Sequence, residues 1–398
     1  MKSKIKIFGE VDERAVAQIE RCSTDGDYAV LCADNHVGYS MPIGGAVAYK
    51  DYISPSGVGF DIACGNKAVK TDIMAKDIDK KRIMDEIARR ISFGIGRVNN
   101  EPADHPVIDE IAGTDFKPQK NMAKLASGQL GTVGSGNHYV DLFEDKDDVL
   151  WVGVHFGSRG FGHKTAMGFL ALAKGLKFEE KPRDANSMDA PPTLLDIKSE
   201  LGKDYIQAMK LAGEYAYAGR DLVVKKVLEI LGAKSIFEVH NHHNFAWLEE
   251  HFGRKYWVVR KGCTPAFPGQ QSFIGSTMGG TSYIIEGVDS DESKNSLYST
   301  VHGAGRVMSR TKAAGKRKWK HGKMIHVTRG EINFKRVKEE LKQKGIELRG
   351  GGADEAPEVY KNLNEVLNYH QNTIKILSRL KPIGVAMAGE DVYDPYKD

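Results

Sequence analysis

The stretch GVGFDIACG at residues 57–65 holds a carboxylate, Asp61, and a thiol, Cys64, among three glycines. Glycine adopts positive φ angles easily and lets the backbone approach a bound group closely. Similar stretches recur along the chain, and most of them also carry His, Asn or Arg: GTVGSGN at 131–137, GSRGFG at 157–162, GSTMGG at 275–280 and HGAG at 302–305. Ordinary turns would explain the glycines alone. Because polar side chains accompany them, we favour loops that meet at one binding cleft.

The segments between these loops do not alternate regularly between strands and helices. Short apolar runs predict strands and amphipathic spacing predicts helices, the first of which is opened by Asp12 as N-cap. The predicted strands are 4–8, 28–33, 235–240, 255–260 and 282–286, and the predicted helices are 12–21, 75–92, 193–231, one after His302 and one at 359–379. Residues 177–192 are expected to cross the surface. The expected fold class is therefore α+β, a single large mixed domain over residues 1–398.

The bulk composition excludes several classes of protein. Charged residues make up 28% of the 398 residues, and no apolar run approaches the ~18 residues that a membrane-spanning helix needs. The N-terminus lacks the features of a signal peptide, so a cytoplasmic location without membrane attachment is expected. The four cysteines are scattered without a CxxC pair, which argues against a disulfide framework or a zinc ribbon. The net charge of +4 is compatible with a nucleic-acid partner but does not by itself indicate one.

One pair of predicted strands would bring two histidines together. Residues 137–143 and 149–156 alternate like strands around the polar turn EDKDD. With the turn centred near Lys146 and Asp147, His138 and His155 would face each other with Cβ atoms about 4.5–5.5 Å apart. That spacing suits two ligands of one metal ion or of adjacent ions. A shift of one residue would place them on opposite faces.

Further potential ligands lie elsewhere in the chain. His240, His242 and His243 cluster in VHNHHNF, and Asp61 is three residues from Cys64. A thiolate can bridge two cations, and a carboxylate beside imidazoles shifts the preference towards harder ions such as Mn²⁺. No pair has zinc-finger spacing, so Cys64 as a packed core thiol and hydrogen-bonded histidines remain an alternative.

Nine motifs decide between these alternatives: DNHVGYSMPIGG, GVGFDIACG, GSGNHYVDL, HFGSRGFG, HHNFA, RKGCTPAFPGQ, SYII, HGAGRVMSR and DEAPEVYK. They run from residue 34 to residue 361 in the order found in the RtcB family, which the chain therefore resembles over nearly its whole length. The resemblance implies an RNA ligase of tRNA splicing or RNA repair. Such an enzyme joins a 3′-phosphate or 2′,3′-cyclic phosphate end to a 5′-hydroxyl end, and it uses GTP and two Mn²⁺ ions. The family often works with an activating partner protein.

The resemblance also implies roles for individual residues. Cys64 would bridge both metal ions, with Asp61 and His138 completing one site and His155 and His243 the other. His302 would be the nucleophile that takes GMP from GTP, and its small neighbours Gly303, Ala304 and Gly305 leave room for a nucleotide. Taken alone, His302 could instead be a histidine that starts a helix and bonds to the backbone.

The same resemblance implies which residues contact the nucleotide and which contact the RNA. The implied nucleotide contacts are Asp34, Asn137, Tyr139, Asp141, Asn244, Thr277, Ser282, Ala304 and Tyr360. Tyr139, Asp141 and Thr277 replace the Phe, Glu and Ser usual in the family, and each contact could instead be a turn or capping residue. The implied RNA contacts are Arg159, Lys261, Arg306 and Arg310, where Arg can hold phosphate bidentately. GKRKWKHGK at 315–323 combines charge with Trp319 for stacking on single-stranded RNA, although a solvated surface would look the same.

The C-terminus departs from the family pattern. The usual ending is a Lys-Gly pair whose lysine contacts the guanine nucleotide, whereas this chain has Ala388-Gly389, with Lys397 further on. The departure places GTP selectivity in question. It motivates a second hypothesis, a metal-dependent RNA end-processing phosphoesterase that opens cyclic phosphates without sealing. A third, a non-enzymatic RNA-binding protein, is disfavoured by the complete ligand set.

Overall fold

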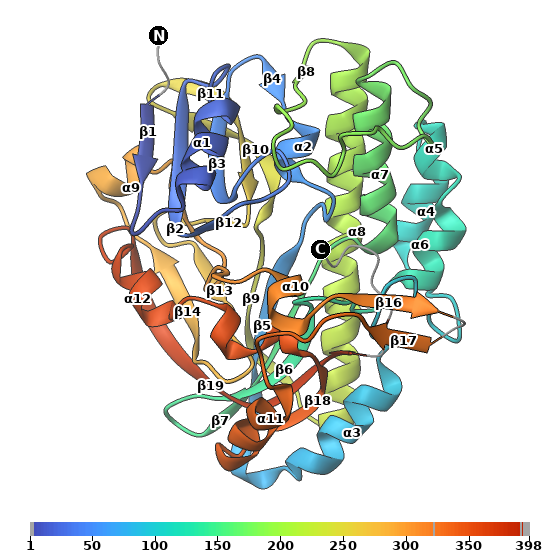
Figure 1. Ribbon diagram of the computed structural model, residues 1–398, viewed down its shortest axis with the longest axis vertical. Coiled ribbons are helices and arrows are strands. Elements are labelled where there is room, and N and C mark those ends of the chain that lie inside the picture. The colour runs from blue at the N-terminus through green and yellow to red at the C-terminus, as the bar shows by residue number, and fades with distance from the viewer. Residues whose placement is uncertain (1–3, 321–322, 391, 393–398) are drawn as a thin grey trace.

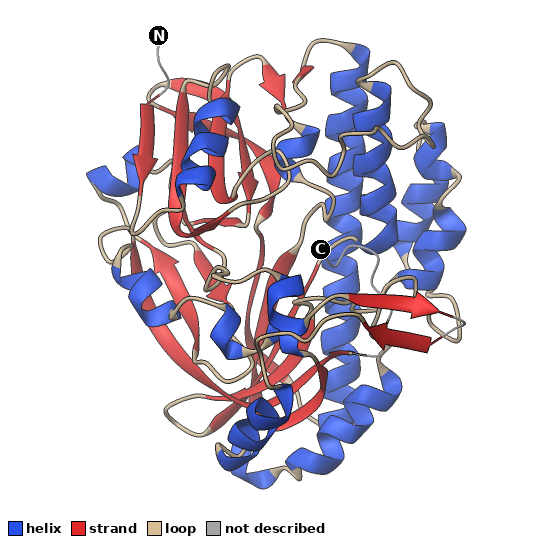
Figure 2. Ribbon diagram, viewed as in Figure 1, coloured by secondary structure: helices blue, strands red, loops and turns tan. Residues whose placement is uncertain are grey.

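Two large β-sheets and a layer of long helices form the main body of the computed structural model, with these sheets on one side and the helices on the other (Figures 1 and 2). The structure describes all residues except 1–3, 321–322, 391 and 393–398. Within this described part, no helix combines the length and the apolar composition needed to cross a bilayer.

The first sheet contains the N-terminal strands. Its order is β1-β2-β3-β11-β10, with β1 parallel to β2 and the other pairs antiparallel. The strands are β1 (Lys4–Ile7), β2 (Tyr28–His36), β3 (Ile43–Tyr49), β10 (Asn244–His251) and β11 (Arg254–Lys261). Helix α1 (Glu13–Cys22) packs on β2, and its N-cap Asp12 accepts a hydrogen bond from Arg14 N at 2.8 Å. The predictions of the first strand, the Asp12 cap and this helix are confirmed.

The second sheet curls until its two ends meet. Its order is β13-β14-β19-β6-β7-β5-β9, with β18 added in parallel to β19. The strands are β5 (Gly65–Met74), β6 (Tyr139–Glu144), β7 (Val149–Phe156), β9 (Ser235–His242), β13 (Gln271–Ile274), β14 (Ser282–Gly287), β18 (Glu347–Gly351) and β19 (Ile374–Gly389). Asn66 Nδ2 donates to Phe273 O at 2.9 Å, and Phe273 N donates to Asn241 Oδ1 at 3.2 Å. These bonds link β13 to β5 and β9, so the sheet is nearly a closed barrel.

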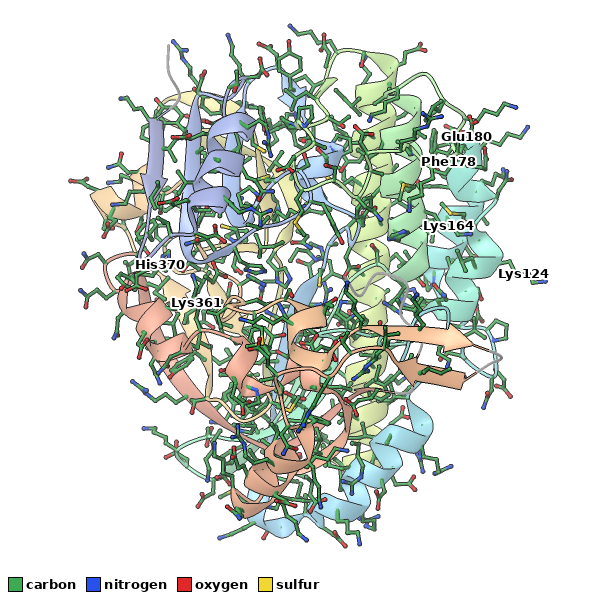
Figure 3. All side chains as sticks on the ribbon, in the orientation of Figure 1. Lys124, Lys164, Phe178, Glu180, Lys361 and His370 are labelled. Atoms are coloured by element: carbon green, nitrogen blue, oxygen red, sulfur yellow. The ribbon has the colours of Figure 1, made fainter. Side chains whose placement is uncertain are left out.

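The helical layer is built around α8 (Glu200–Leu231), which is 32 residues long and packs on β5 and β7. Its neighbours are α4 (Pro106–Gly113), α5 (Lys117–Lys120), α6 (Ala123–Gln129) and α7 (Arg159–Leu172). Ser199 caps the start of α8, and Gly232 ends it in the left-handed conformation. Residues 177–192 cross the surface without regular structure, but the Phe178 ring packs against Phe116 and Phe169 on the helical side (Figure 3).

Shorter elements connect these layers. They are β4 (Tyr52–Ile53), α2 (Pro55–Val58), η1 (Ala75–Asp77), α3 (Lys80–Arg90), β8 (Leu195–Asp196), β12 (Cys263–Pro265), α9 (Asp291–Asn295), β15 (Ser299–Val301), α10 (Arg310–Ala314), β16 (Arg317–Lys320), β17 (Lys323–His326), α11 (Phe334–Gln343), η2 (Ala353–Glu355), η3 (Pro357–Val359) and α12 (Leu363–Asn368).

Several predicted helices have different bounds. The helix predicted at 75–92 begins at Lys80, because Asp79 caps it after a short 3₁₀ turn. The helix predicted at 193–231 begins at Glu200, after β8. The helix predicted after His302 was largely wrong, because residues 302–309 form a loop and only the five-residue α10 follows. In this loop Gly305 has φ +78° and packs against the carbonyl of Asp34.

The helix predicted at 359–379 was also largely wrong. Only α12 is helical, and residues 374–379 belong to strand β19. This segment pairs with β14, where Ile376 faces Ile285. Pairing with a distant strand therefore overrides the local helical pattern.

The hairpin of β6 and β7 forms, but its predicted register was wrong by one residue. His155 faces Tyr139, not His138. Asp148 in the turn adopts φ 58°, which lets the connection take one more residue than predicted. The α+β fold class is confirmed.

Candidate active site

A cleft of about 270 Å³ opens above one row of side chains on the curled sheet. Met387 on β19 faces Tyr139 on β6, Tyr139 faces His155 on β7, and His155 faces Asn66 on β5. Paired residues project from the same face of a sheet. Val385 and Asp141, two residues along their strands, form a second pair on this face. All these residues line the cleft.

Three side chains at one end of the cleft form the first potential cation site. The ligand atoms of Cys64, His155 and His243 all lie within 4.8 Å of one another. His155 Nε2 is 3.6 Å from Cys64 Sγ. Its Nδ1 is 2.6 Å from Asn66 Oδ1, which is an acceptor, so Nδ1 carries the proton and Nε2 presents its lone pair to the cleft.

The second potential site shares the same thiol. Asp61, Cys64 and His138 also offer ligand atoms within 4.8 Å of one another. His138 Nε2 lies 3.6 Å from Cys64 Sγ and 3.0 Å from Asp61 Oδ2. His138 precedes β6, so the alternation of the strand does not fix its side chain. The two histidines therefore converge on Cys64 although they do not face each other in the hairpin.

The loop that carries Asp61 and Cys64 is tied to the turn that carries His243. Ala63 N donates to Asn244 O at 2.7 Å, and His243 N donates to Cys64 O at 2.9 Å. Gly65 allows this close approach, because a Cβ there would lie 2.2 Å from Asn241 O. The backbone thus places Cys64 and His243 side by side before any ion is considered.

The donor set fits divalent cations. His243 Nδ1 is buried and has no hydrogen-bond partner within the described part of the chain. Burial lowers the pKa of His155 and His243 well below the usual value, so both rings are neutral ligands. Burial and the charge of Asp61 raise the pKa of Cys64, so a bound cation would displace the thiol proton.

Asp61 provides the negative charge of this group. Burial would raise its pKa, but the hydrogen bond and charge of His138, together with the charge of Arg159, lower it to about 2. Nitrogen, thiolate and carboxylate donors together suit a transition-metal ion such as Mn²⁺.

His302 lies beside the first group and is oriented by a buried carboxylate. Its ring centroid is 4.8 Å from that of His243. Asp34 Oδ2 accepts hydrogen bonds from His302 Nδ1 at 2.7 Å and from His302 N at 3.0 Å. Burial would raise the pKa of Asp34, but the bonds and charge of His302 keep it below the usual value. Nδ1 therefore holds the proton, and Nε2 is left as a potential nucleophile on the cleft wall.

Most of the predicted nucleotide contacts line the cleft. Those on its wall are Asn137, Tyr139, Asp141, Asn244, Thr277, Ala304 and Tyr360. Asp34 is fully buried behind His302 and is not on the wall. Ser282 is buried too, and its hydroxyl accepts a hydrogen bond from Ser276 N at 3.0 Å. The structure thus places Asp34 and Ser282 as supports of the wall.

Two of the wall residues carry unpartnered polar atoms. Tyr139 Oη and Asp141 Oδ1 are buried without a hydrogen-bond partner among the described residues. Burial raises the pKa of Asp141 well above its usual value, although a hydrogen bond from the backbone of Ala386 opposes this. By contrast, the side-chain amide of Asn244 already has hydrogen-bond partners in the protein. Its Oδ1 accepts a hydrogen bond from Gly262 N at 2.6 Å, and its Nδ2 donates one to Asp61 O at 3.3 Å.

The predicted RNA contacts divide into two pairs. Arg306 and Arg310 line the cleft, and Arg310 pairs with Asp354 and Glu355. Arg159 does not line the cleft, and its guanidinium donates to Thr132 Oγ1 at 3.4 Å.

Lys261 is almost fully buried, and its ammonium group donates to the carbonyl of Tyr39 at 2.5 Å. Burial lowers the pKa of Lys261 to about 8. Lys261, Arg306 and Arg310 all line a second groove of about 720 Å³ beside the cleft. Arg14 and Lys361 also contribute to this groove, and Figure 3 shows Lys361 on the side of the molecule away from the helical layer.

Comparison with known proteins shows the family of this chain. A family model described as tRNA-splicing ligase RtcB matches residues 15–117 and 109–388. The tRNA-splicing ligase RtcB of Archaeoglobus fulgidus is 30% identical, with 96% of this chain and 92% of that protein aligned. The chain belongs to the RtcB family.

Two further members of the family give the same result. The RNA-splicing ligase RtcB homolog 1 of Entamoeba dispar is 31% identical, with 88% of this chain and 77% of that protein aligned. The RNA-splicing ligase RtcB of Escherichia coli is 28% identical, with 89% of each chain aligned. The resemblance carried by the nine motifs is thereby confirmed.

Some cleft residues of this RtcB-family chain were not predicted. Asn66 fixes the tautomer of His155 and follows directly after GFDIACG, so its position beside the motif was a usable signal. Val385 and Met387 lie on β19, which was not predicted as a strand. No sequence pattern indicated that these two apolar side chains face the cleft.

The departure at the C-terminus lies next to this wall. Val385 and Met387 line the cleft, whereas Ala388 does not. Lys397 lies outside the described residues. The position of the usual family lysine therefore follows immediately after a cleft residue, at the end of β19.

The basic segment 315–323 belongs to a separate hairpin. β16 and β17 pair antiparallel, and Lys316 and Lys318 are exposed. Residues 321–322 and the side chain of Trp319 lie outside the described part of the chain. RNA stacking on Trp319 stays a prediction.

Proposed function

We propose that this chain is an RNA ligase that joins a 3′-phosphate or 2′,3′-cyclic phosphate end to a 5′-hydroxyl end, in tRNA splicing or in repair of broken RNA. It uses GTP and two Mn²⁺ ions, and residues 1–398 form one catalytic domain that acts in the cytoplasm. Membership of the RtcB family supports the reaction class.

One observation supports the assignment of residues above all others. The two potential cation groups share Cys64, and the His302 ring lies 4.8 Å from His243, a member of one group. Asp61 and His138 would hold one cation with Cys64, and His155 and His243 the other. When bound, the cations neutralise phosphate charge and polarise the phosphorus.

His302 carries out the first step. Its Nε2 lone pair attacks the α-phosphorus of GTP, an N–P bond forms, and the bond to the β-phosphate breaks to release pyrophosphate. The ring becomes positively charged while Nδ1 keeps its proton. Asp34, 2.7 Å away, balances this charge.

The remaining steps pass GMP to RNA. An oxygen of the RNA 3′-phosphate attacks the phosphorus of GMP, the N–P bond breaks, and its electron pair returns to Nε2 of His302. The 5′-hydroxyl of the second RNA then attacks the activated 3′-phosphorus, GMP leaves, and the hydroxyl proton goes to solvent. A cyclic phosphate is first opened by water at the bond to the 2′-oxygen.

The groove beside the cleft gives RNA a route to His302. It shares Arg306 and Arg310 with the cleft and adds Arg14, Lys261 and Lys361. These cationic side chains extend from the cleft along the groove, an arrangement that suits the phosphate backbone of RNA. RNA binding by such contacts weakens as the salt concentration increases. Tyr139, Asp141 and Tyr360 line the cleft but not this groove, so we assign them to the nucleotide.

The role of Asp34 leads to the first prediction. Asp34→Asn keeps a hydrogen-bond acceptor for His302 but removes the charge that balances the ring. A charged bond is stronger than a neutral one by about 1–2 kcal/mol, so guanylylation should slow by roughly 10-fold. Rapid-quench labelling with α-labelled GTP measures the rate. An unchanged rate in a variant with wild-type melting temperature would rule out this role.

Ligation itself provides the second prediction. An RNA with a 2′,3′-cyclic phosphate and a partner with a 5′-hydroxyl should give a joined product with Mn²⁺ and GTP, and at least about 10-fold less with ATP. An opened but unjoined 3′-phosphate would instead favour the end-processing phosphoesterase, the alternative that Ala388 motivates. Joining that appears only after a cell extract is added would indicate the activating protein that the family resemblance suggests.

A further inference from the structure

Arg220, in the middle of α8, is fully buried and makes four hydrogen bonds to three different segments. Its Nη1 donates to Ala63 O at 3.0 Å and to Phe156 O at 2.6 Å. Its Nη2 donates to His242 Nδ1 at 2.9 Å, and its Nε donates to His240 Nε2 at 2.8 Å. One side chain thus joins the helical layer to the loop before β5, to β7 and to β9.

Each of these segments carries a member of one potential cation group. Ala63 directly precedes Cys64, Phe156 directly follows His155, and His242 directly precedes His243. The three residues next to these acceptors are the complete first group. No bond of Arg220 reaches a neighbour of His138, which belongs to the second group.

The chemistry of arginine suits such a junction. The guanidinium holds its donors in one rigid plane, whereas a lysine ammonium is a single point on a flexible stem. Burying a cation is unfavourable without compensating partners, and no carboxylate in the described part of the chain forms an ion pair with Arg220. Burial lowers its pKa to about 10, so it remains charged at neutral pH.

We infer that Arg220 is a positioning residue that holds Cys64, His155 and His243 at the spacing of one cation site. This inference rests on the proposed function, in which that group binds a cation. A purely structural role for Arg220 would predict a loss of stability without a selective effect on one of the two sites.

The test uses Co²⁺ as the probe, because cobalt bound to a thiolate absorbs light and its affinity can be titrated on the full chain. Removing an outer residue that orients metal ligands typically costs about 10–100-fold in affinity. Arg220→Lys should therefore lower the affinity for one of the two bound Co²⁺ ions by about 10–100-fold, with much less effect on the affinity for the other. Calorimetry and titration of the cobalt–thiolate absorption band would measure the two affinities.

Arg260→Lys is the matched control. Arg260 is also fully buried, but its guanidinium binds Glu249 at 2.6 and 2.9 Å, away from both groups. This variant should lose thermal stability while both cobalt affinities stay as in the wild type. Equal cobalt affinities in Arg220→Lys and wild type would overturn the positioning role.

His242→Phe provides a second variant if Arg220→Lys does not fold. Phenylalanine keeps the ring packing of His242 against Tyr217 and Phe245 but removes the acceptor for Arg220 Nη2. The affinity for the same Co²⁺ ion should fall, and unchanged binding would contradict the inference. A wild-type chain that shows no cobalt–thiolate absorption would instead refute the metal centre of the proposed function.

Discussion

Replacing His302 by alanine should abolish the transfer of label from α-labelled GTP to the protein. Removing the nucleophile of a covalent mechanism leaves no atom to carry GMP, so labelling should fall by at least about 1,000-fold. Asp34 holds the ring through Nδ1, which leaves Nε2 of His302 as the nitrogen that can carry GMP. Gel analysis of the protein after incubation with Mn²⁺ and GTP measures the labelled fraction.

The metal content of the same variant is its control. His302 belongs to neither group of potential ligands, so His302→Ala should bind as much Mn²⁺ as the wild type. A variant that keeps its metal and still becomes labelled would show that another residue receives GMP. Label that is stable to acid in the wild type would also contradict a phosphorus–nitrogen bond.

Replacing Cys64 by serine should weaken cation binding at both sites together. Cys64 is the one residue that the two groups share, and a serine hydroxyl is a much poorer ligand for a transition metal than a thiolate. The loss at each site should exceed the about 10–100-fold typical of removing an outer residue. Titration with Mn²⁺, followed by electron paramagnetic resonance of the free ion, gives both affinities.

Cys22→Ser is the matched control for this variant. Cys22 is also a buried thiol, but its Sγ bonds to the carbonyl of Ser40 at 3.5 Å and belongs to neither group. It should retain both cations. If Cys64→Ser loses one cation and keeps the other at wild-type affinity, the thiol does not bridge two ions.

Local sequence signals predicted those parts of the fold that local interactions determine. Asp12 caps α1, and the long run that forms α8 is ended by Gly232. Strand β19 was not predicted, because its first half has a helix-like pattern and becomes a strand by pairing with β14. The register of β6 and β7 depended on one left-handed residue in the turn, Asp148.

The candidate site was predictable to a different degree. Composition and spacing did not decide whether the chain holds a metal site. The order of motifs such as GFDIACG and HGAGR, through the family resemblance, supplied the ligand set. Asn66 directly follows the motif GFDIACG, so its place in the site could have been predicted. Arg220 could not, because an arginine within a helical pattern usually indicates a solvent-exposed face, and only the packing of α8 against β5 and β7 buries it.

The two-cation centre can be observed directly by anomalous X-ray scattering at the manganese edge, from crystals of the full chain grown with Mn²⁺. A two-cation centre at Cys64 would give two peaks on either side of its Sγ, one between Asp61 and His138 and the other between His155 and His243. A single peak away from Cys64, or no peak in the cleft at saturating Mn²⁺, would contradict it.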